Sequence, residues 1–213
     1  MPRTRLRSVS EQAASTNGKE TVGTLKWSCF QTPPALLIVD LQHAIDDPSW
    51  GPRNNLGAEV CVARLLAAWR RQGWPIIHIR HDSTEPTSTY RPGQPGNRFK
   101  PEAMPLDGET VIAKRTNSAF IDTELQTHLQ AKGIDTLVIA GVSTSNSVDA
   151  TVRMAGNLGY KAYLVEDACF TFARRDWSGL ARTAQEVHDM ALAILDGEYC
   201  TVIRSAMLPG MAD

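Results

Sequence analysis

Three polar features of the sequence follow apolar runs, and their residue types suit acid–base chemistry. Asp40 ends the first run, Lys114 ends the third, and the polar turn 141–148 follows the fourth. If these runs are strands of a parallel sheet, all three features lie beyond its carboxyl edge, where open α/β folds bind their ligands. The sequence therefore predicts a site made of Asp40, Lys114 and this turn.

The acid and the lysine are expected to pair. An acid that closes a buried apolar strand is costly unless a charged partner compensates it, and Lys114 is the natural partner of Asp40. Two interpretations of the pair remain open at this point. It is either a purely structural ion pair or part of a functional site.

The elements that must position these residues alternate along the chain. We expect strands over 35–40, 74–79, 110–114, 136–140, 162–165 and 200–203. Helical periodicity is expected over 58–71, 121–131, 145–157 and 184–195. Strands that alternate with helices form βαβ units, which predicts one α/β domain with a parallel sheet and helices on both faces.

A long segment without periodicity, residues 82–107, separates the second and third strands and is rich in Pro, Gly, Ser and Thr. A loop of this length inside a compact domain is usually functional. Its residues Asn97 and Phe99 are equally suited to cover a substrate or to contact a second subunit. Trp50, which follows the first strand, is a further candidate for the wall of a pocket.

Charge and hydropathy limit the partners. The 22 Lys and Arg residues nearly balance the 23 Asp and Glu residues, and the formal net charge is −1. No basic cluster is interleaved with aromatic residues, so we expect no nucleic-acid partner. No apolar run approaches the roughly 20 residues that cross a bilayer, so we expect no membrane partner. The four cysteines are scattered, which is typical of reduced thiols and predicts a cytoplasmic protein.

The first thirty residues differ from the rest. Residues 1–30 are polar, and the basic, Ser-rich start MPRTRLRSVS precedes no hydrophobic stretch, so it is not a secretory signal. It is similar in composition to a mitochondrial presequence, but a disordered polar tail is the expected form. A single domain is predicted over residues 31–213.

Three ordered segments resemble the signature segments of the isochorismatase-like cysteine hydrolase family. They are LIVDLQ at 37–42, KRTNSAF at 114–120 and GVSTSNSV at 141–148. Stretches at 150–160 and 165–168 fit as well, and the similarity runs from about residue 34 to residue 203. The resemblance implies a Rossmann-like three-layer sandwich with a mostly parallel central sheet, and a catalytic Asp-Lys-Cys triad.

Carried over by position, the resemblance assigns roles to individual residues. Asp40 becomes the proton-transfer group, Lys114 balances the charge and lowers the pKa of the nucleophile, and Ser147 stands where the family has its cysteine. The family pattern also implies a cis peptide between Val142 and Ser143. It would aim the backbone N–H groups of Ser143 and Ser147 as an oxyanion hole.

Four further residues, in these segments and the loops beside them, are predicted to bind substrate: Gln42, Trp50, Phe99 and Asn117.

The serine changes the expected chemistry. A cysteine beside a lysine at a helix N-terminus can have its pKa lowered well below about 8.5, whereas a serine needs a positioned general base, usually histidine. An aspartate carboxylate, with an ordinary pKa of about 4, is a weak base for an alcohol. His43, His78 and His81 lie near the expected strand ends but form no triad that the sequence can support.

Three interpretations of Ser147 therefore remain open. It is an engineered cysteine replacement, or a natural variant that still uses the hydroxyl. Alternatively the site uses no covalent nucleophile, as in isochorismatases, where the aspartate acts on a vinyl ether by acid–base chemistry. The favoured function is hydrolysis of a C–N bond in a small amide or ureide. A catalytically degenerate protein that only binds a small molecule is the rival from a different class.

No cofactor or metal is predicted. The glycines form no phosphate-binding motif, so nucleotide binding is unsupported. His78 and His81 are three residues apart, and strand geometry sends such residues to opposite faces. The resemblance implies one further partner, a second or further copies of the chain, in a homodimer or homotetramer.

Overall fold

The computed structural model describes residue 30 and residues 32–211, and its centre is a parallel sheet of six strands. The strand order is β3-β2-β1-β4-β5-β8, and every neighbouring pair is parallel. The strands are β1 Ala35–Val39, β2 Ile76–His81, β3 Thr110–Lys114, β4 Thr136–Val142, β5 Lys161–Phe170 and β8 Thr201–Ile203. The predicted tail, apart from residue 30, lies outside the described residues.

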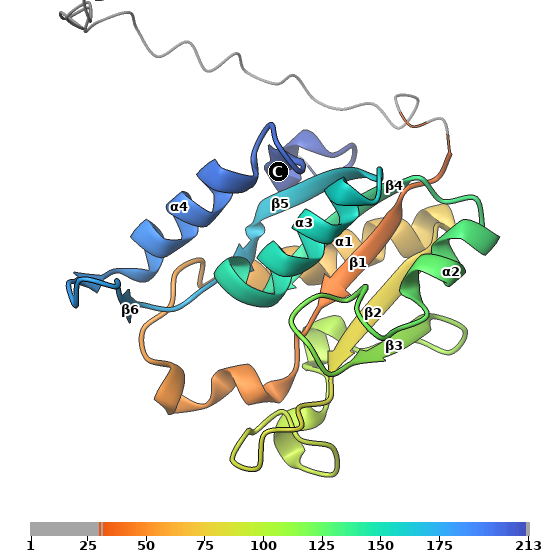
Figure 1. Ribbon diagram of the computed structural model, residues 1–213. Helices are drawn as coiled ribbons and strands as arrows, with labels where there is room; N and C mark the ends of the chain where they lie inside the picture. The colour runs from red at the N-terminus through yellow and green to blue at the C-terminus, as the bar shows by residue number, and fades with distance from the viewer. Residues whose placement is uncertain (1–29, 31, 212–213) are drawn as a thin grey trace, which may run out of the picture.

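Four helices cover the sheet: α1 Ala58–Gln72, α2 Leu125–Ala131, α3 Asp149–Asn157 and α4 Ala184–Leu195. In Figure 1, α3 lies in front of the sheet and α1 lies behind it, so helices cover both faces. The predicted three-layer α/β sandwich is confirmed. None of the helices within the described part of the chain is long and apolar enough to cross a membrane.

Burial explains why the inner and edge strands differ in sequence. All residues of β1 and β4 are buried, and strands covered on both faces need no polar alternation. The edge strand β3 alternates instead, with Ile112 and Lys114 buried and the residues between and before them more exposed. The alternation turns the Lys114 side chain toward the interior at the carboxyl end of the sheet.

Gly141 permits the close approach of β4 to β1 beside the predicted site. Its φ is 129°, and a Cβ at this position would overlap the Val39 carbonyl oxygen. A side chain here would therefore push apart the two strands that carry Asp40 and the turn 141–148.

Some boundaries differ from the prediction. The helix expected over 121–131 begins at Leu125, and the one expected over 145–157 begins at Asp149, because residues Thr144–Val148 form a separate π-helical turn. Two short antiparallel strands, β6 Arg174–Arg175 and β7 Ala181–Arg182, were not expected. The long loop contains two 3-10 segments, Pro95–Asn97 and Pro101–Ala103.

Candidate functional site

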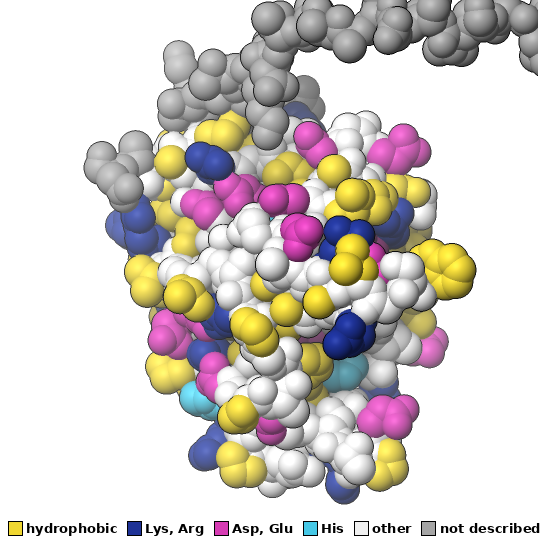
Figure 2. Space-filling model, turned by 90° about the vertical axis from the view of Figure 1, so that its left-hand side faces the viewer, with side chains coloured by type: hydrophobic (Ala, Val, Ile, Leu, Met, Phe, Trp, Pro, Cys, Tyr) yellow, Lys and Arg dark blue, Asp and Glu magenta, His cyan; other side chains and the backbone are white. Residues whose placement is uncertain are grey.

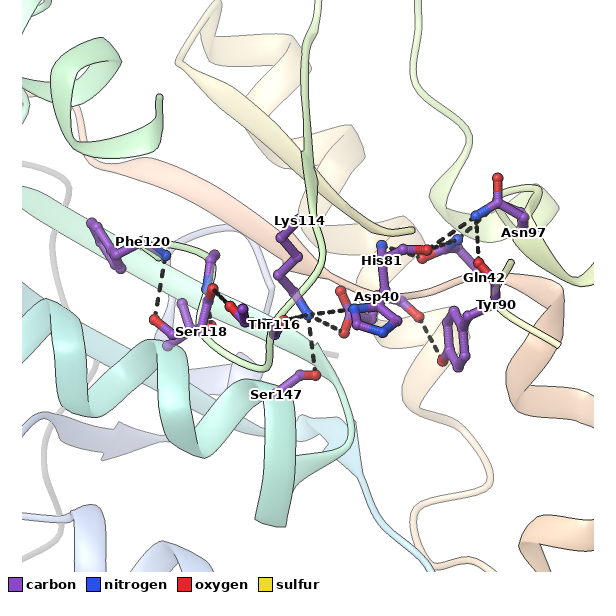
Figure 3. A network of polar contacts seen from close by, with 12 residues as sticks. Asp40, Gln42, His81, Tyr90, Asn97, Lys114, Thr116, Ser118, Phe120 and Ser147 are labelled. Atoms are coloured by element: carbon purple, nitrogen blue, oxygen red, sulfur yellow. Dashed lines mark hydrogen bonds and ion pairs between the residues drawn. The ribbon is translucent and has the colours of Figure 1, made fainter. Parts of the chain in front are cut away.

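The carboxyl ends of β1, β3 and β4 bring the three predicted catalytic residues together. Lys114 Nζ donates to Asp40 Oδ2 at 2.6 Å and to Ser147 Oγ at 3.2 Å (Figure 3). The side chains are almost fully enclosed, since Asp40 is 3%, Lys114 1% and Ser147 8% exposed. The Lys114 ammonium group therefore contacts both an acid and a hydroxyl in a site that is largely closed to water.

Asp40 has one oxygen that the protein leaves without a partner. Oδ2 accepts from Lys114, whereas Oδ1 is buried and has no hydrogen-bond partner among the described residues. The backbone adopts the left-handed conformation, with φ of 54°, and the Tyr90 hydroxyl donates to the Asp40 carbonyl at 3.2 Å. Because buried polar atoms are normally paired, Oδ1 is available to a substrate or to a transferred proton.

Ser147 belongs to the π-helical turn that precedes α3. The Ser143 carbonyl accepts from the N–H groups of Asn146 at 3.0 Å and Val148 at 3.2 Å, which closes the turn. The Val142–Ser143 peptide is cis, as predicted. In Figure 3 the Ser147 hydroxyl points from this turn toward Lys114.

Side chains from two other elements brace this turn. Thr144 Oγ1 lies 2.9 Å from Nδ1 of His188, a buried residue of α4. Thr171 Oγ1 lies 2.7 Å from Ser143 Oγ and 2.9 Å from Ser145 Oγ. The side-chain hydroxyls of Ser143 and Ser145 are thus engaged within the protein. The oxyanion hole predicted from the Ser143 and Ser147 backbone N–H groups remains a prediction.

His81, which the sequence offered no triad to place, and Tyr90, which it did not single out, both lie beside the predicted catalytic residues. His81 Nδ1 lies 3.3 Å from Lys114 Nζ, and the rings of His81 and Tyr90 meet edge to face with centroids 5.4 Å apart. Burial lowers the pKa of His81 below its ordinary value, so the ring is neutral at pH 7. Burial raises the pKa of Tyr90, which keeps its hydroxyl protonated.

Gln42 does not serve the predicted role in substrate binding. Its side chain is fully buried, and Nε2 donates to the carbonyls of His81 at 3.1 Å and Asn97 at 2.8 Å. Its Oε1 accepts from the His81 N–H at 2.7 Å. With both amide N–H groups engaged, Gln42 holds the long loop and the end of β2 in place.

Phe99 is also placed differently from the prediction. Its ring packs edge to face against His78, with centroids 5.7 Å apart. His78 lies on the face of β2 opposite to His81 and pairs with Glu109 at 2.9 Å. Phe99 therefore packs away from the cluster formed by Asp40, Lys114 and His81.

Trp50 and Asn117 stay candidates for contact with a substrate. Trp50 is 41% exposed, stacks on Phe172 and meets the edge of Tyr90 with ring centroids 6.5 Å apart. The Tyr90 ring, which also contacts His81, therefore connects Trp50 to the site. Asn117 is exposed in the loop that follows Lys114.

The described cysteines offer no substitute nucleophile. Cys61, Cys169 and Cys200 are free and buried. Burial raises the pKa of Cys61 to about 11 and that of Cys200 to about 12, and it raises the pKa of Cys169 further. All three thiols are protonated at neutral pH, and Cys29 lies outside the described residues. Within that described part, no three His, Cys, Asp or Glu side chains are arranged to hold a metal ion.

Comparison with known proteins gives consistent matches over most of the chain. The Isochorismatase domain model matches residues 34–206. The isochorismatase family protein YrdC of Bacillus subtilis (strain 168) is 41% identical over 174 residues, which cover 82% of this chain and 93% of that protein. A solved structure of the isochorismatase family from Chromobacterium violaceum ATCC 12472 is 64% identical, has a TM-score of 0.82, and the match covers 84% of this chain and 93% of that one.

A more distant relative is the ureidoacrylate amidohydrolase RutB of Variovorax paradoxus (strain S110). It is 27% identical over 169 residues, which cover 63% of this chain and 67% of that protein.

Proposed function

The chain belongs to the isochorismatase family, and from this premise we propose that it hydrolyses a C–N bond in a small amide or ureide. The observation that carries the proposal is the single ammonium group of Lys114 in contact with both Asp40 and Ser147. The distant similarity to a ureidoacrylate amidohydrolase supports the choice of bond.

The proposed reaction has two halves. In the first, Ser147 Oγ attacks the carbonyl carbon of the substrate, and Asp40 takes the hydroxyl proton on its unpartnered Oδ1. The C–N bond then breaks, and the leaving nitrogen takes the proton from Asp40. In the second, water attacks the acyl-serine ester, Asp40 accepts a proton from the water, and the carboxylic acid leaves as the proton returns to Ser147 Oγ.

Lys114 supplies the electrostatics of both halves. Its ammonium lies beside the Asp40 carboxylate and the Ser147 oxygen, in a site where the low exposure of all three residues strengthens charge interactions. The oxyanion that forms on the substrate would be bound by the predicted N–H groups of Ser143 and Ser147.

A second candidate function uses the same residues without a covalent step. With a proton taken from water, the unpartnered Oδ1 of Asp40 is also suited to protonate a substrate directly, as isochorismatase-type acid–base hydrolysis requires. In that reaction the Ser147 hydroxyl would only contact the substrate. A protein that binds a small molecule and turns nothing over is the third case.

Turnover of an amide and ureide panel separates these cases. We expect slow hydrolysis by the natural chain, faster hydrolysis by Ser147→Cys because a thiolate forms beside Lys114, and none by Asp40→Asn. Equal rates for the natural chain and Ser147→Ala would favour the reaction without a nucleophile. Tight binding of a panel member without turnover by either the natural chain or Ser147→Cys would contradict the hydrolase proposal.

We also propose that the chain assembles with further copies of itself, as a homodimer or homotetramer. The face formed by α4 and the β6–β7 hairpin exposes large apolar side chains: Trp177, Leu180, Met190 and Ile194. Figure 2 shows this side of the molecule, where hydrophobic side chains lie among both basic and acidic ones. Light scattering after size exclusion should give a particle mass of at least twice the 23.4 kDa chain mass, and Met190→Glu should lower that particle mass.

A further inference from the structure

Lys114 has more acceptors than it has protons to give. Its Nζ lies within hydrogen-bond distance of four acceptors, namely Asp40 Oδ2 at 2.6 Å, the Thr116 carbonyl at 3.0 Å, Ser147 Oγ at 3.2 Å and His81 Nδ1 at 3.3 Å. An ammonium group carries only three N–H donors. One of the four contacts must therefore lack a proton from Lys114 at any moment.

The identity of the four acceptors decides which contact gives way. The Asp40 carboxylate and the Thr116 carbonyl can only accept, and they are the two shortest contacts. The third N–H is thus shared between Ser147 and His81. The Ser147 hydroxyl can accept and donate at the same time, whereas Nδ1 of a neutral histidine can accept only when the ring proton is on Nε2.

We propose that His81 is a positioning residue for Lys114: with its proton on Nε2, its Nδ1 accepts the third N–H of Lys114 jointly with Ser147 Oγ and so holds the ammonium between Asp40 and Ser147. The inference rests on the proposed function, in which the Lys114 ammonium must stay in contact with both Asp40 and Ser147. His81 acts through Lys114 and transfers no proton itself.

The surroundings of His81 suit this role. The Asp40 carboxylate from the end of β1, Lys114 from β3 and Asp82 from the loop after β2 all act on the ring, and Tyr90 packs against it with centroids 5.4 Å apart. Asp82 is itself paired with Arg80 at 2.9 Å, which weakens its tendency to raise the pKa of His81. The Gln42 amide fixes the His81 backbone at both its N–H and its carbonyl. The ring is therefore held beside Lys114.

Protonation of His81 would break the arrangement. Nδ1 would become a donor and no longer accept from Lys114, and a second positive charge would face the ammonium and displace it from its position between Asp40 and Ser147. Because burial lowers the pKa of His81, this change falls below its ordinary value of about 6.5. We therefore expect kcat to fall as the pH falls through the pKa of His81 and to be constant above it.

Two substitutions divide the functions of the ring. His81→Asn places an amide oxygen near the position of Nδ1, keeps an acceptor for Lys114 and cannot be protonated. His81→Gln places its amide near the position of Nε2 and loses the acceptor. We expect His81→Asn to retain kcat within a few-fold and to lose the fall of kcat at acid pH that His81 causes. We expect His81→Gln to lower kcat about ten-fold or more. His43→Asn is the matched control, since His43 is half-exposed and pairs with Asp46.

The test combines the pH dependence of kcat for the natural chain and these variants with nitrogen NMR of the labelled histidines. The His81 signals are assigned by their loss in His81→Asn. A bare Nδ1 and a protonated Nε2 at neutral pH, with kcat retained in Asn but not in Gln, is the expected result.

A proton on Nδ1, an equal loss of kcat in both variants, or an unchanged fall of kcat at acid pH in His81→Asn would overturn the inference. The proposed function fails separately, when the natural chain and Ser147→Cys both turn over no panel member. The NMR measurement needs no substrate, so it decides the tautomer even then.

Discussion

The buried pair of Asp40 and Lys114 should respond unequally to single and double substitution. The two residues are 3% and 1% exposed, and Nζ lies 2.6 Å from Oδ2. Lys114→Met keeps most of the side-chain length but leaves the carboxylate buried without its counter-ion. Removal of one partner of such a pair costs about 3–5 kcal/mol of the free energy of unfolding. Asp40→Asn leaves the ammonium uncompensated and should cost a similar amount.

The double variant Asp40→Asn/Lys114→Met leaves no charge of this pair uncompensated. We therefore expect it to cost less than either single change, with a coupling free energy of more than about 3 kcal/mol. Urea unfolding gives all three values, because the free energy of unfolding falls linearly with denaturant. Arg182→Met is the control: it breaks a solvent-exposed pair with Asp176 and should leave the free energy of unfolding nearly unchanged, because water screens such pairs.

Additive costs of the two single changes would refute this reasoning, since they would show that the charges do not compensate each other. The folded double variant also separates the two interpretations of the pair. A functional pair predicts a stable protein without hydrolytic activity, whereas activity retained in the double variant would make the pair structural.

Three other predictions test the frame around the site. Gly141→Ala should lower the free energy of unfolding in urea by about 4 kcal/mol or more, because the added Cβ overlaps the Val39 carbonyl. Gly108→Ala is the control: its φ is 89° but the space around it is open, so it should cost only the backbone strain of about 1–3 kcal/mol. Equal costs for the two variants would contradict the predicted overlap. Gln42→Met removes three buried hydrogen bonds and should cost about 2–4 kcal/mol, and a change below about 1 kcal/mol would show that the loop is held otherwise. Burial tends to raise the pKa of Glu109, but its hydrogen bonds outweigh this and lower the pKa to about 2. Its contribution to the free energy of unfolding is therefore complete above its ordinary pKa of 4.5 and is lost as the pH falls toward 2. Glu109→Gln should make the free energy of unfolding depend less on pH between 4.5 and 2, and an unchanged pH dependence would count against this reasoning.

The main features of the fold and the core of the site could be predicted because they depend on local patterns and one topological rule. Apolar runs such as 35–39 are buried strands, and α4 has the expected bounds, with a capping box of Thr183 and Glu186 at its start. The convergence of Asp40, Lys114 and the turn 141–148 follows from the rule that parallel strands present their carboxyl ends at one edge, and the family resemblance singles out Ser147 within that turn.

The rest depends on register and side-chain packing, which no local pattern specifies. His81 reaches Lys114 because the β2–β3 register places the two residues opposite each other. Gln42 was predicted to face a substrate, but its amide satisfies backbone groups of residues 39 and 55 positions away. The β6–β7 hairpin escaped prediction because two-residue strands are too short to show alternation.

The most direct test of the central claim is the intact mass of the Ser147→Cys variant after brief incubation with a small amide or ureide that it hydrolyses. We expect an added acyl group on the thiol introduced by this substitution, mapped to the peptide that spans the turn 141–148, and none when Asp40→Asn is added. Hydrolysis without an acyl adduct on that peptide, under conditions that trap a known acyl-enzyme, would contradict a nucleophile at this position.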